Sequence, residues 1–71
     1  MTRAAKAIKK MRLKMNLSPP ALSVELGLKS KGHIWMIENG LKNPSVALCH
    51  RIIRLASGYG IDLTLDELLG E

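Results

Sequence analysis

The sequence is poor in aromatic residues, with one Trp, one Tyr and no Phe among 71 residues. Hydrophobic residues still make up 46% of the chain, so Leu, Ile, Val and Met must fill its core. Strand signals are also weak, because Asn39-Gly40 follows a helical pattern and does not join two alternating apolar runs. A chain of this length suffices for one domain. We therefore expect a single all-α domain over residues 1–71.

Cysteine and long apolar runs are equally scarce. Cys49 is the only cysteine, which excludes an intramolecular disulfide and leaves no cysteine set for a metal. No apolar run approaches the ~18 residues that a membrane span requires. The basic N-terminus lacks the apolar stretch of a signal peptide. We expect a cytoplasmic protein that needs no cofactor and holds no metal.

Acidic residues are few, and the imbalance is concentrated in one part of the chain. The net charge is +5 and the isoelectric point about 9.8. Residues 1–42 carry a net charge of +7, whereas residues 43–71 carry −2. This distribution favours a polyanionic partner for the first part, although ordinary solvated surfaces would also account for it.

The best-defined pattern is a pair of short helices joined by a glycine-containing turn. Ser18 can cap a helix over residues 19–26, and Gly27 can end it in the left-handed conformation. Ser30 can cap a second helix over residues 31–38. Two helices joined in this way are typical of the helix-turn-helix, whose second helix, the recognition helix, enters the DNA major groove.

Three more helices are predicted on either side of this pair, over residues 2–15, 46–57 and 65–69. The first buries a stripe formed by Ile8, Met11 and Met15. Arg12 lies on the same stripe, and a buried arginine needs a carboxylate partner. We expect that partner to be Glu38, which follows the inward-facing Ile37.

Two apolar faces are predicted for the helix over residues 46–57. Val46, Cys49, Ile53 and Ala56 form the expected core face, and Leu48 and Leu55 lie on another. For the last helix, Thr64 and Glu67 have the spacing of a capping box.

These segments together resemble the phage repressor/Cro-type helix-turn-helix proteins, the XRE family, over about residues 5–69. The resemblance rests on Ile8-x-x-Met11-Arg12, Leu17-Ser18, Leu22, Leu26-Gly27, Ile34-x-x-Ile37-Glu38-Asn39-Gly40, Asn43-Pro44-Ser45 and Leu63-Thr64-Leu65-Asp66-Glu67-Leu68-Leu69. It implies a five-helix, lambda-repressor-like DNA-binding domain that acts as a homodimer on a palindromic operator. In that family an arginine of the first helix commonly pairs with the glutamate that closes the recognition helix, which supports the Arg12–Glu38 pair.

Two positions depart from the family pattern. Pro19 occupies the place where the family usually has a glutamine that donates a hydrogen bond to a phosphate. The turn also has Leu28-Lys29 where the commonest form has one residue. Aligning backward from Ile34 gives the outward, base-reading positions as Lys31, Gly32, His33, Trp35 and Met36.

Each base-reading position has an alternative role. Lys31 can donate to guanine O6 and N7, or touch phosphate alone. Gly32 either permits close approach to DNA or is merely tolerated in a first turn, and His33 either donates to DNA or is an ordinary surface residue. Trp35 and Met36 can contact thymine methyl groups, or Trp35 can pack between helices.

Other polar residues are expected to contact phosphates, which position the protein without reading sequence. These residues are Ser18, Lys29, Ser30, Asn39, Lys42 and Asn43. For Ser18 the expected donors include free N–H groups at the start of the helix over residues 19–26. Binding through phosphates should weaken steeply as salt rises.

The second apolar face of the helix over residues 46–57 predicts a homodimer. The expected interface consists of Leu48, Leu55, Leu65 and Leu69. The alternative is that the last helix folds over Leu48 and Leu55 within a monomer.

The sequence thus predicts a sequence-specific, DNA-binding transcriptional regulator of bacterial, phage or mobile-element type. The main alternative is the antitoxin of a toxin–antitoxin pair, which would bind a toxin protein and regulate its own operon; polymerase is another candidate protein partner. A control protein of a restriction–modification system or mobile element would differ from the first reading only in its target genes. An enzyme is not expected, because the chain has only two His and one Cys. Its one pair of neighbouring carboxylates, Asp66-Glu67, is already explained as the start of a helix.

Overall fold

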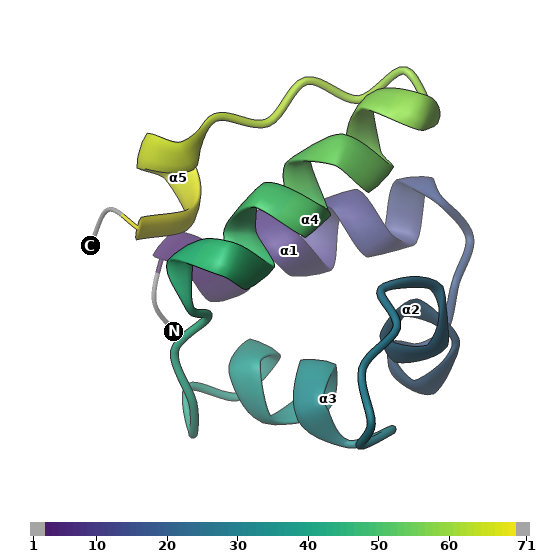
Figure 1. Cartoon of the computed structure of the whole chain (residues 1–71), viewed down its shortest axis with the longest axis vertical. Helices are drawn as coiled ribbons and strands as arrows, with labels where there is room; N and C mark the ends of the chain where they lie inside the picture. The colour runs from purple at the N-terminus through teal and green to yellow at the C-terminus, as the bar shows by residue number, and fades with distance from the viewer. Residues whose placement is uncertain (1–2, 70–71) are drawn as a thin grey trace.

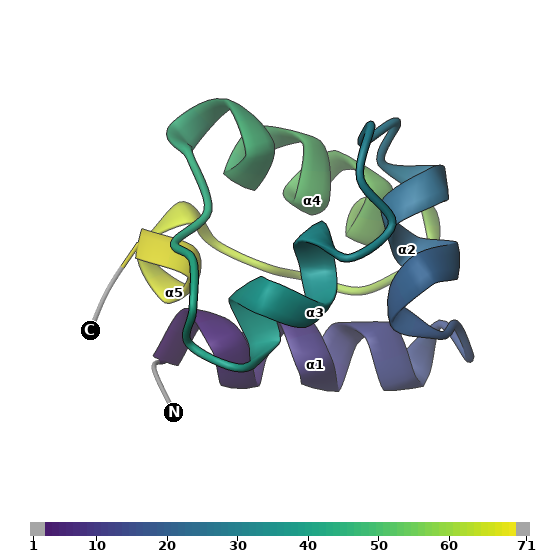
Figure 2. The same cartoon turned by 90° about the horizontal axis from the view of Figure 1, so that it is seen from below.

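The computed structural model describes residues 3–69, and this part of the chain is all-helical with no strand. The helices are α1 (Arg3–Lys14), α2 (Pro19–Glu25), α3 (His33–Glu38), α4 (Val46–Gly58) and α5 (Leu65–Leu69). The predicted all-α class is confirmed for these residues. Figure 2 shows α1 and α4 on opposite sides of the molecule, with α2 closing one end and α5 the other, and Figure 1 shows α3 along the edge below α1 and α4. Figure 1 shows the beginning of α4 beside α5.

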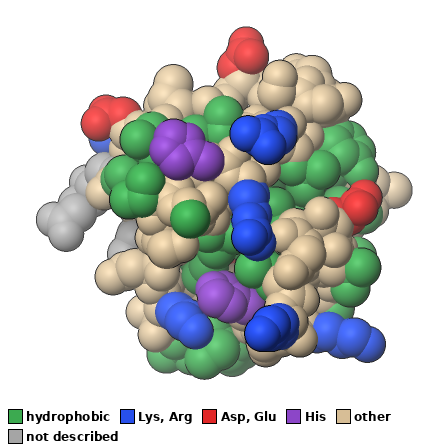
Figure 3. Space-filling view, in the orientation of Figure 1, with side chains coloured by type: hydrophobic (Ala, Val, Ile, Leu, Met, Phe, Trp, Pro, Cys, Tyr) green, Lys and Arg blue, Asp and Glu red, His purple; other side chains and the backbone are tan. Residues whose placement is uncertain are grey.

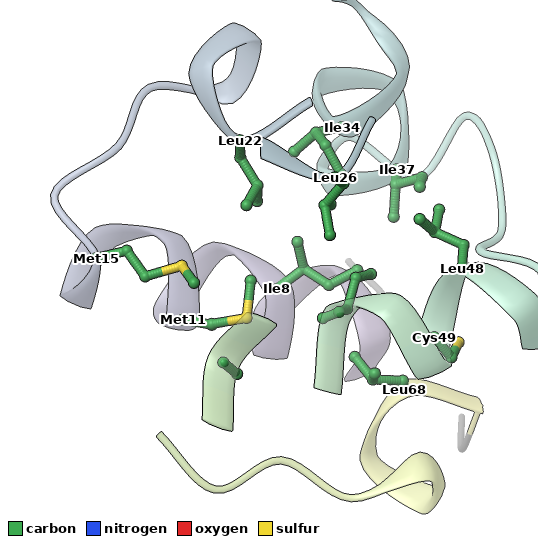
Figure 4. Close-up of a cluster of buried hydrophobic side chains, with 12 residues drawn as sticks. Ile8, Met11, Met15, Leu22, Leu26, Ile34, Ile37, Leu48, Cys49 and Leu68 are labelled. Carbon is green, nitrogen blue, oxygen red and sulfur yellow. The ribbon is translucent and has the colours of Figure 1, made fainter. Parts of the chain in front are cut away.

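Aliphatic and methionine side chains fill the core, as the scarcity of aromatic residues predicts. Its buried members are Ile8, Met11, Met15, Leu22, Leu26, Ile34, Ile37, Leu48, Cys49, Ile52, Ala56 and Leu68. In Figure 4, Leu22 of α2 and Leu26, which directly follows this helix, point toward Ile8 of α1, so apolar contact joins the two helices. Burial raises the pKa of the Cys49 thiol, so this cysteine stays neutral and acts as a small core residue.

Three of the predicted caps, at Ser18, Ser45 and Thr64, are present in the structure. Ser18 Oγ accepts from Ala21 N at 3.2 Å, and Ser45 Oγ accepts from Leu48 N at 3.1 Å. Thr64 Oγ1 accepts from Glu67 N at 3.2 Å while a carboxylate oxygen of Glu67 accepts from Thr64 N at 3.1 Å, which is the reciprocal capping box. These polar residues fix where α2, α4 and α5 begin.

The core face of α4 differs from the prediction. Leu48, Cys49, Ile52 and Ala56 are buried, whereas Val46 is 52% exposed. Helical periodicity alone left the choice open, because α4 has apolar residues on most of its circumference. Packing of α5 against α4 selects the face that contains Leu48. The prediction that Leu48 contributes to a dimer interface is wrong, since this side chain is only 5% exposed.

The third helix also begins later than predicted, at His33 instead of residue 31. Ser30 does not cap it; its hydroxyl oxygen accepts from Gly32 N at 3.3 Å within the turn. A serine that bonds two residues ahead holds the chain in a turn, and Gly32 has low helix propensity, so the two delay the helix. Lys31 and Gly32 therefore lie before α3.

The other helix ends match the prediction to within a residue. Glu25 ends α2 one residue earlier than expected, and Gly58 ends α4 one residue later. The expected start at residue 2 lies outside the described residues, and α1 ends at Lys14. Asn16 follows with a φ of 60°, a left-handed conformation that asparagine adopts more readily than most residues. In the described part of the chain no helix has both the length and the apolar character needed to cross a membrane.

Candidate nucleic-acid interface

A buried ion pair fixes α3 against α1. Arg12 Nε lies 2.7 Å from Glu38 Oε2, and Arg12 Nη2 donates to Glu38 Oε1 at 3.0 Å. The third donor, Nη1, reaches the Leu17 carbonyl oxygen at 2.8 Å. The structure therefore contains the predicted Arg12–Glu38 pair. Because the pair is bidentate and tied to the segment before α2, it sets the position of the last turn of α3.

The turn between α2 and α3 is held by a second buried contact. Ser23 is fully buried, and its hydroxyl donates to the Lys31 carbonyl oxygen at 3.2 Å. The Leu28 amide donates to the Ser23 carbonyl oxygen at 2.9 Å, and the Leu28 side chain packs against the core. Lys31 therefore has a fixed backbone, while its side chain is exposed.

The two faces of α3 differ in chemistry. Ile34 and Ile37 are buried, whereas Trp35 is 52% exposed and Met36 37% exposed. The alternative in which Trp35 packs between helices is wrong, because half of its surface faces solvent. Gly32 is exposed and His33 half-buried. The outward surface of this segment thus combines one ammonium group, one imidazole and two large apolar groups.

The predicted phosphate-contacting residues lie around this surface. Lys29, Ser30, Asn39, Lys42 and Asn43 are all exposed. The first two precede α3 and the last three follow it, so the set brackets the helix at both ends. Figure 3 shows Lys and Arg side chains over the middle and lower part of the visible face, with carboxylates near its rim.

Two members of this set already make hydrogen bonds within the fold. The Asn39 side-chain amide donates to the Trp35 carbonyl oxygen at 2.8 Å, which leaves it one further N–H. Ser30 accepts from Gly32 N and keeps its hydroxyl hydrogen. Both residues can still donate one hydrogen bond to a phosphate.

The start of α2 lacks the free N–H groups that were expected to hold a phosphate. Pro19 and Pro20 have no N–H, and the Ala21 amide donates to Ser18 Oγ. The Leu22 amide donates to the Ser18 carbonyl oxygen at 2.9 Å. Every N–H of this first turn is therefore missing or used. Only the hydroxyl hydrogen of Ser18 is available to an anion there.

The other three residues of the predicted dimer interface differ in their exposure to solvent. Leu55 is half-buried on α4, Leu65 is half-buried against the core, and Leu69 is 45% exposed. Sequence reasoning missed the exposure of Leu41 and Val46, which are 65% and 52% exposed. No sequence signal could have shown that Val46 is exposed, because its spacing fits the core face of α4 equally well.

Within residues 3–69, His, Cys, Asp and Glu form no group of three that could hold a metal ion. No protein-family model, curated protein or solved structure matches the chain.

Proposed function

We propose that this protein is a sequence-specific DNA-binding transcriptional regulator in which α2 and α3 form a helix-turn-helix. The observation that carries the proposal is the outward face of α3. Trp35 and Met36 are exposed there, although Ile34 and Ile37 hold the same helix to the core. Two large apolar groups beside a lysine and a histidine suit the major groove, where thymine methyl groups and base-edge acceptors lie together. The resemblance to phage repressor/Cro-type proteins supports the same function.

In this proposal the residues divide into two roles. Lys31 donates to guanine O6 and N7, and Trp35 and Met36 contact thymine methyl groups. His33 donates to a base or a phosphate. The residues on either side of α3 hold phosphates, and the Ser18 hydroxyl adds one donor. Since Pro19 removes the usual donor at the start of α2, the lysines carry most of the phosphate contact.

The regulator acts as a homodimer on a palindromic operator, because one α3 reads only a half-site. Because Leu48 is buried, the exposed apolar side chains near the start of α4 and on α5 form the dimer contact in this proposal. Val46 and Leu69 are the central pair, and the half-buried Leu65 packs against the core. Figures 1 and 2 both place α5, which ends at Leu69, beside the first turn of α4, which begins at Val46.

The proposal is tested by titrating the protein onto DNA from upstream of its own gene and onto a scrambled duplex, at 50 and 200 mM salt. We expect tight, cooperative binding to the upstream DNA alone, with a steep loss of affinity at the higher salt. Trp35→Ala should weaken specific binding about tenfold or more, since a good base contact contributes about 1–3 kcal/mol.

The matched control is Leu13→Ala, which removes another exposed apolar side chain, 61% exposed on α1. It should bind as the unchanged protein does. Equal binding to both duplexes, unaffected by Trp35→Ala, would reject sequence-specific recognition by α3.

A further inference from the structure

An open groove of about 390 Å³ lies between the end of α2 and the C-terminal half of α4, and none of the residues assigned to DNA lines it. Its floor is apolar and is formed by Leu26 and Leu55. Figures 1 and 2 both show α2 and the end of α4 on the same side of the molecule. A site for a small molecule usually encloses most of its ligand, whereas this groove is largely open to solvent. Its shape therefore suits a peptide segment.

Two hydrogen bonds across the groove tie α4 to α2. The Tyr59 hydroxyl donates to Glu25 Oε1 at 3.3 Å. Arg51 Nη1 donates to the Leu26 carbonyl oxygen at 3.4 Å. These contacts give the groove defined walls before any partner binds.

The charge along the groove is positive. Arg51 and Arg54 lie three residues apart on one side of α4, and both line the groove. Among the described residues Arg54 has no hydrogen-bond or ion-pair partner, and neither arginine pairs with a carboxylate. Glu25 is the single acidic residue of the lining, and it already accepts from Tyr59. Arg54, and the N–H groups of Arg51 other than the one that donates to Leu26, can therefore bind carboxylates from outside.

Gly58 is an exposed residue of the groove lining, at the end of α4. A Cβ built on this residue meets no atom within 4 Å, and the residue lies four positions after Arg54 on the same helical face. A large side chain at this position therefore has room to cover part of the lining.

We propose that this groove binds an acidic amphipathic helix of another protein. Its leucine-like side chains would cover Leu26 and Leu55, and its carboxylates would pair with Arg51 and Arg54. The chain's own acidic, leucine-rich segment over residues 62–69 has this chemistry, but its Leu68 is buried in the core, so it is not free to bind there. The occupant therefore comes from a partner. This inference does not depend on DNA binding.

The probe is a synthetic helical peptide that repeats leucine at positions i, i+3, i+4 and i+7 with glutamate between them. A counterpart with lysine in place of every glutamate is the control. Binding to the ¹⁵N-labelled full chain is followed by amide chemical shifts. We expect the acidic peptide to shift the amides of Leu55, Gly58 and Tyr59, and the lysine peptide to leave them unchanged.

Two kinds of variant test the groove independently. Gly58→Leu fills it without a change of charge and should weaken the acidic peptide at least tenfold, whereas Gly58→Ala should bind as before. The double variant Arg51→Glu, Arg54→Glu should weaken binding at least tenfold, and Lys6→Glu, Lys9→Glu, with the same change in net charge on exposed positions of α1, should weaken it far less.

Absence of these shifts, or shifts confined to α3, would overturn the proposal. So would unchanged peptide binding by Gly58→Leu. A third result would also overturn it. In this result the Arg51→Glu, Arg54→Glu variant binds DNA more weakly than the Lys6→Glu, Lys9→Glu control, and neither the unchanged protein nor any variant binds the acidic peptide. The two arginines would then contact DNA. Failure of the DNA-binding function would leave peptide binding intact, so the two outcomes are distinguishable.

Discussion

Arg12 and Glu38 place opposite charges inside a core of about a dozen apolar side chains. Taking two charges out of water is costly, and the cost is recovered only when geometry and hydrogen bonding are complete. Here three guanidinium nitrogens donate, two to the carboxylate and one to the Leu17 carbonyl oxygen. Within residues 3–69 no buried side-chain nitrogen or oxygen atom lacks a hydrogen-bond partner. The pair therefore specifies where α3 lies more than it adds to net stability.

Neutralising one partner of the Arg12–Glu38 pair should lower the free energy of unfolding far more than replacing both partners with apolar residues. Glu38→Gln leaves a buried, uncompensated guanidinium and should lower the free energy of unfolding by about 3–5 kcal/mol. Arg12→Met combined with Glu38→Leu should recover most of that loss, because neither charge remains. Urea denaturation followed by circular dichroism measures both. A Glu38→Gln protein as stable as the unchanged one would show that the pair is not desolvated.

Gly32 gives a second prediction at the residue scale. Its φ is −86°, and a Cβ there would approach only Ser30 Oγ, at 3.9 Å, so alanine fits the free protein. Gly32→Ala should leave the melting temperature unchanged or slightly higher. If the backbone approaches DNA closely at this position, the same change should weaken specific DNA binding. Unchanged affinity for DNA would assign Gly32 to the turn alone.

At the scale of elements, the caps could be predicted from sequence and the buried faces only in part. Ser18, Ser45 and Thr64 act on N–H groups within three residues, so local chemistry determines these helix starts. The face of α4 depends on packing against α5, which lies far along the chain, and periodicity could not choose between Val46 and Leu48. The start of α3 was missed because the Ser30 hydroxyl bonds within the turn.

Of the candidate site, the exposed Trp35 and the Arg12–Glu38 pair followed from spacing. The missing N–H groups of α2 followed from Pro19-Pro20 but were overlooked.

The capping box should matter more to α5 than its length suggests. A helix of five residues has little stability of its own and depends on the Thr64 cap and on the buried Leu68. Thr64→Ala should lower the free energy of unfolding by about 1 kcal/mol. Thermal melts of this variant and of Asp62→Ala, an exposed position just before the cap, make the comparison. Equal melting temperatures would mean that packing alone holds α5.

At the scale of the whole molecule, exposed apolar surface near α5 predicts self-association. Leu69→Ser with Val46→Ser should convert the proposed dimer into a monomer while circular dichroism stays unchanged, because both side chains are about half exposed. Leu13→Ser, at a position on α1 that is 61% exposed, is the control and should leave self-association unchanged. Sedimentation equilibrium at high micromolar concentration distinguishes these states. A monomeric unchanged protein at that concentration would refute the dimer.

The central claim is that α3 reads DNA sequence in the major groove. The most direct measurement is selection of bound duplexes from a random DNA library, with the unchanged protein and with Trp35→Ala in parallel. We expect an inverted repeat whose half-sites lie about one helical turn, ~10 base pairs, apart, and loss of a thymine preference in the variant. Enrichment of no sequence, or of the same sequence by both proteins, would contradict it.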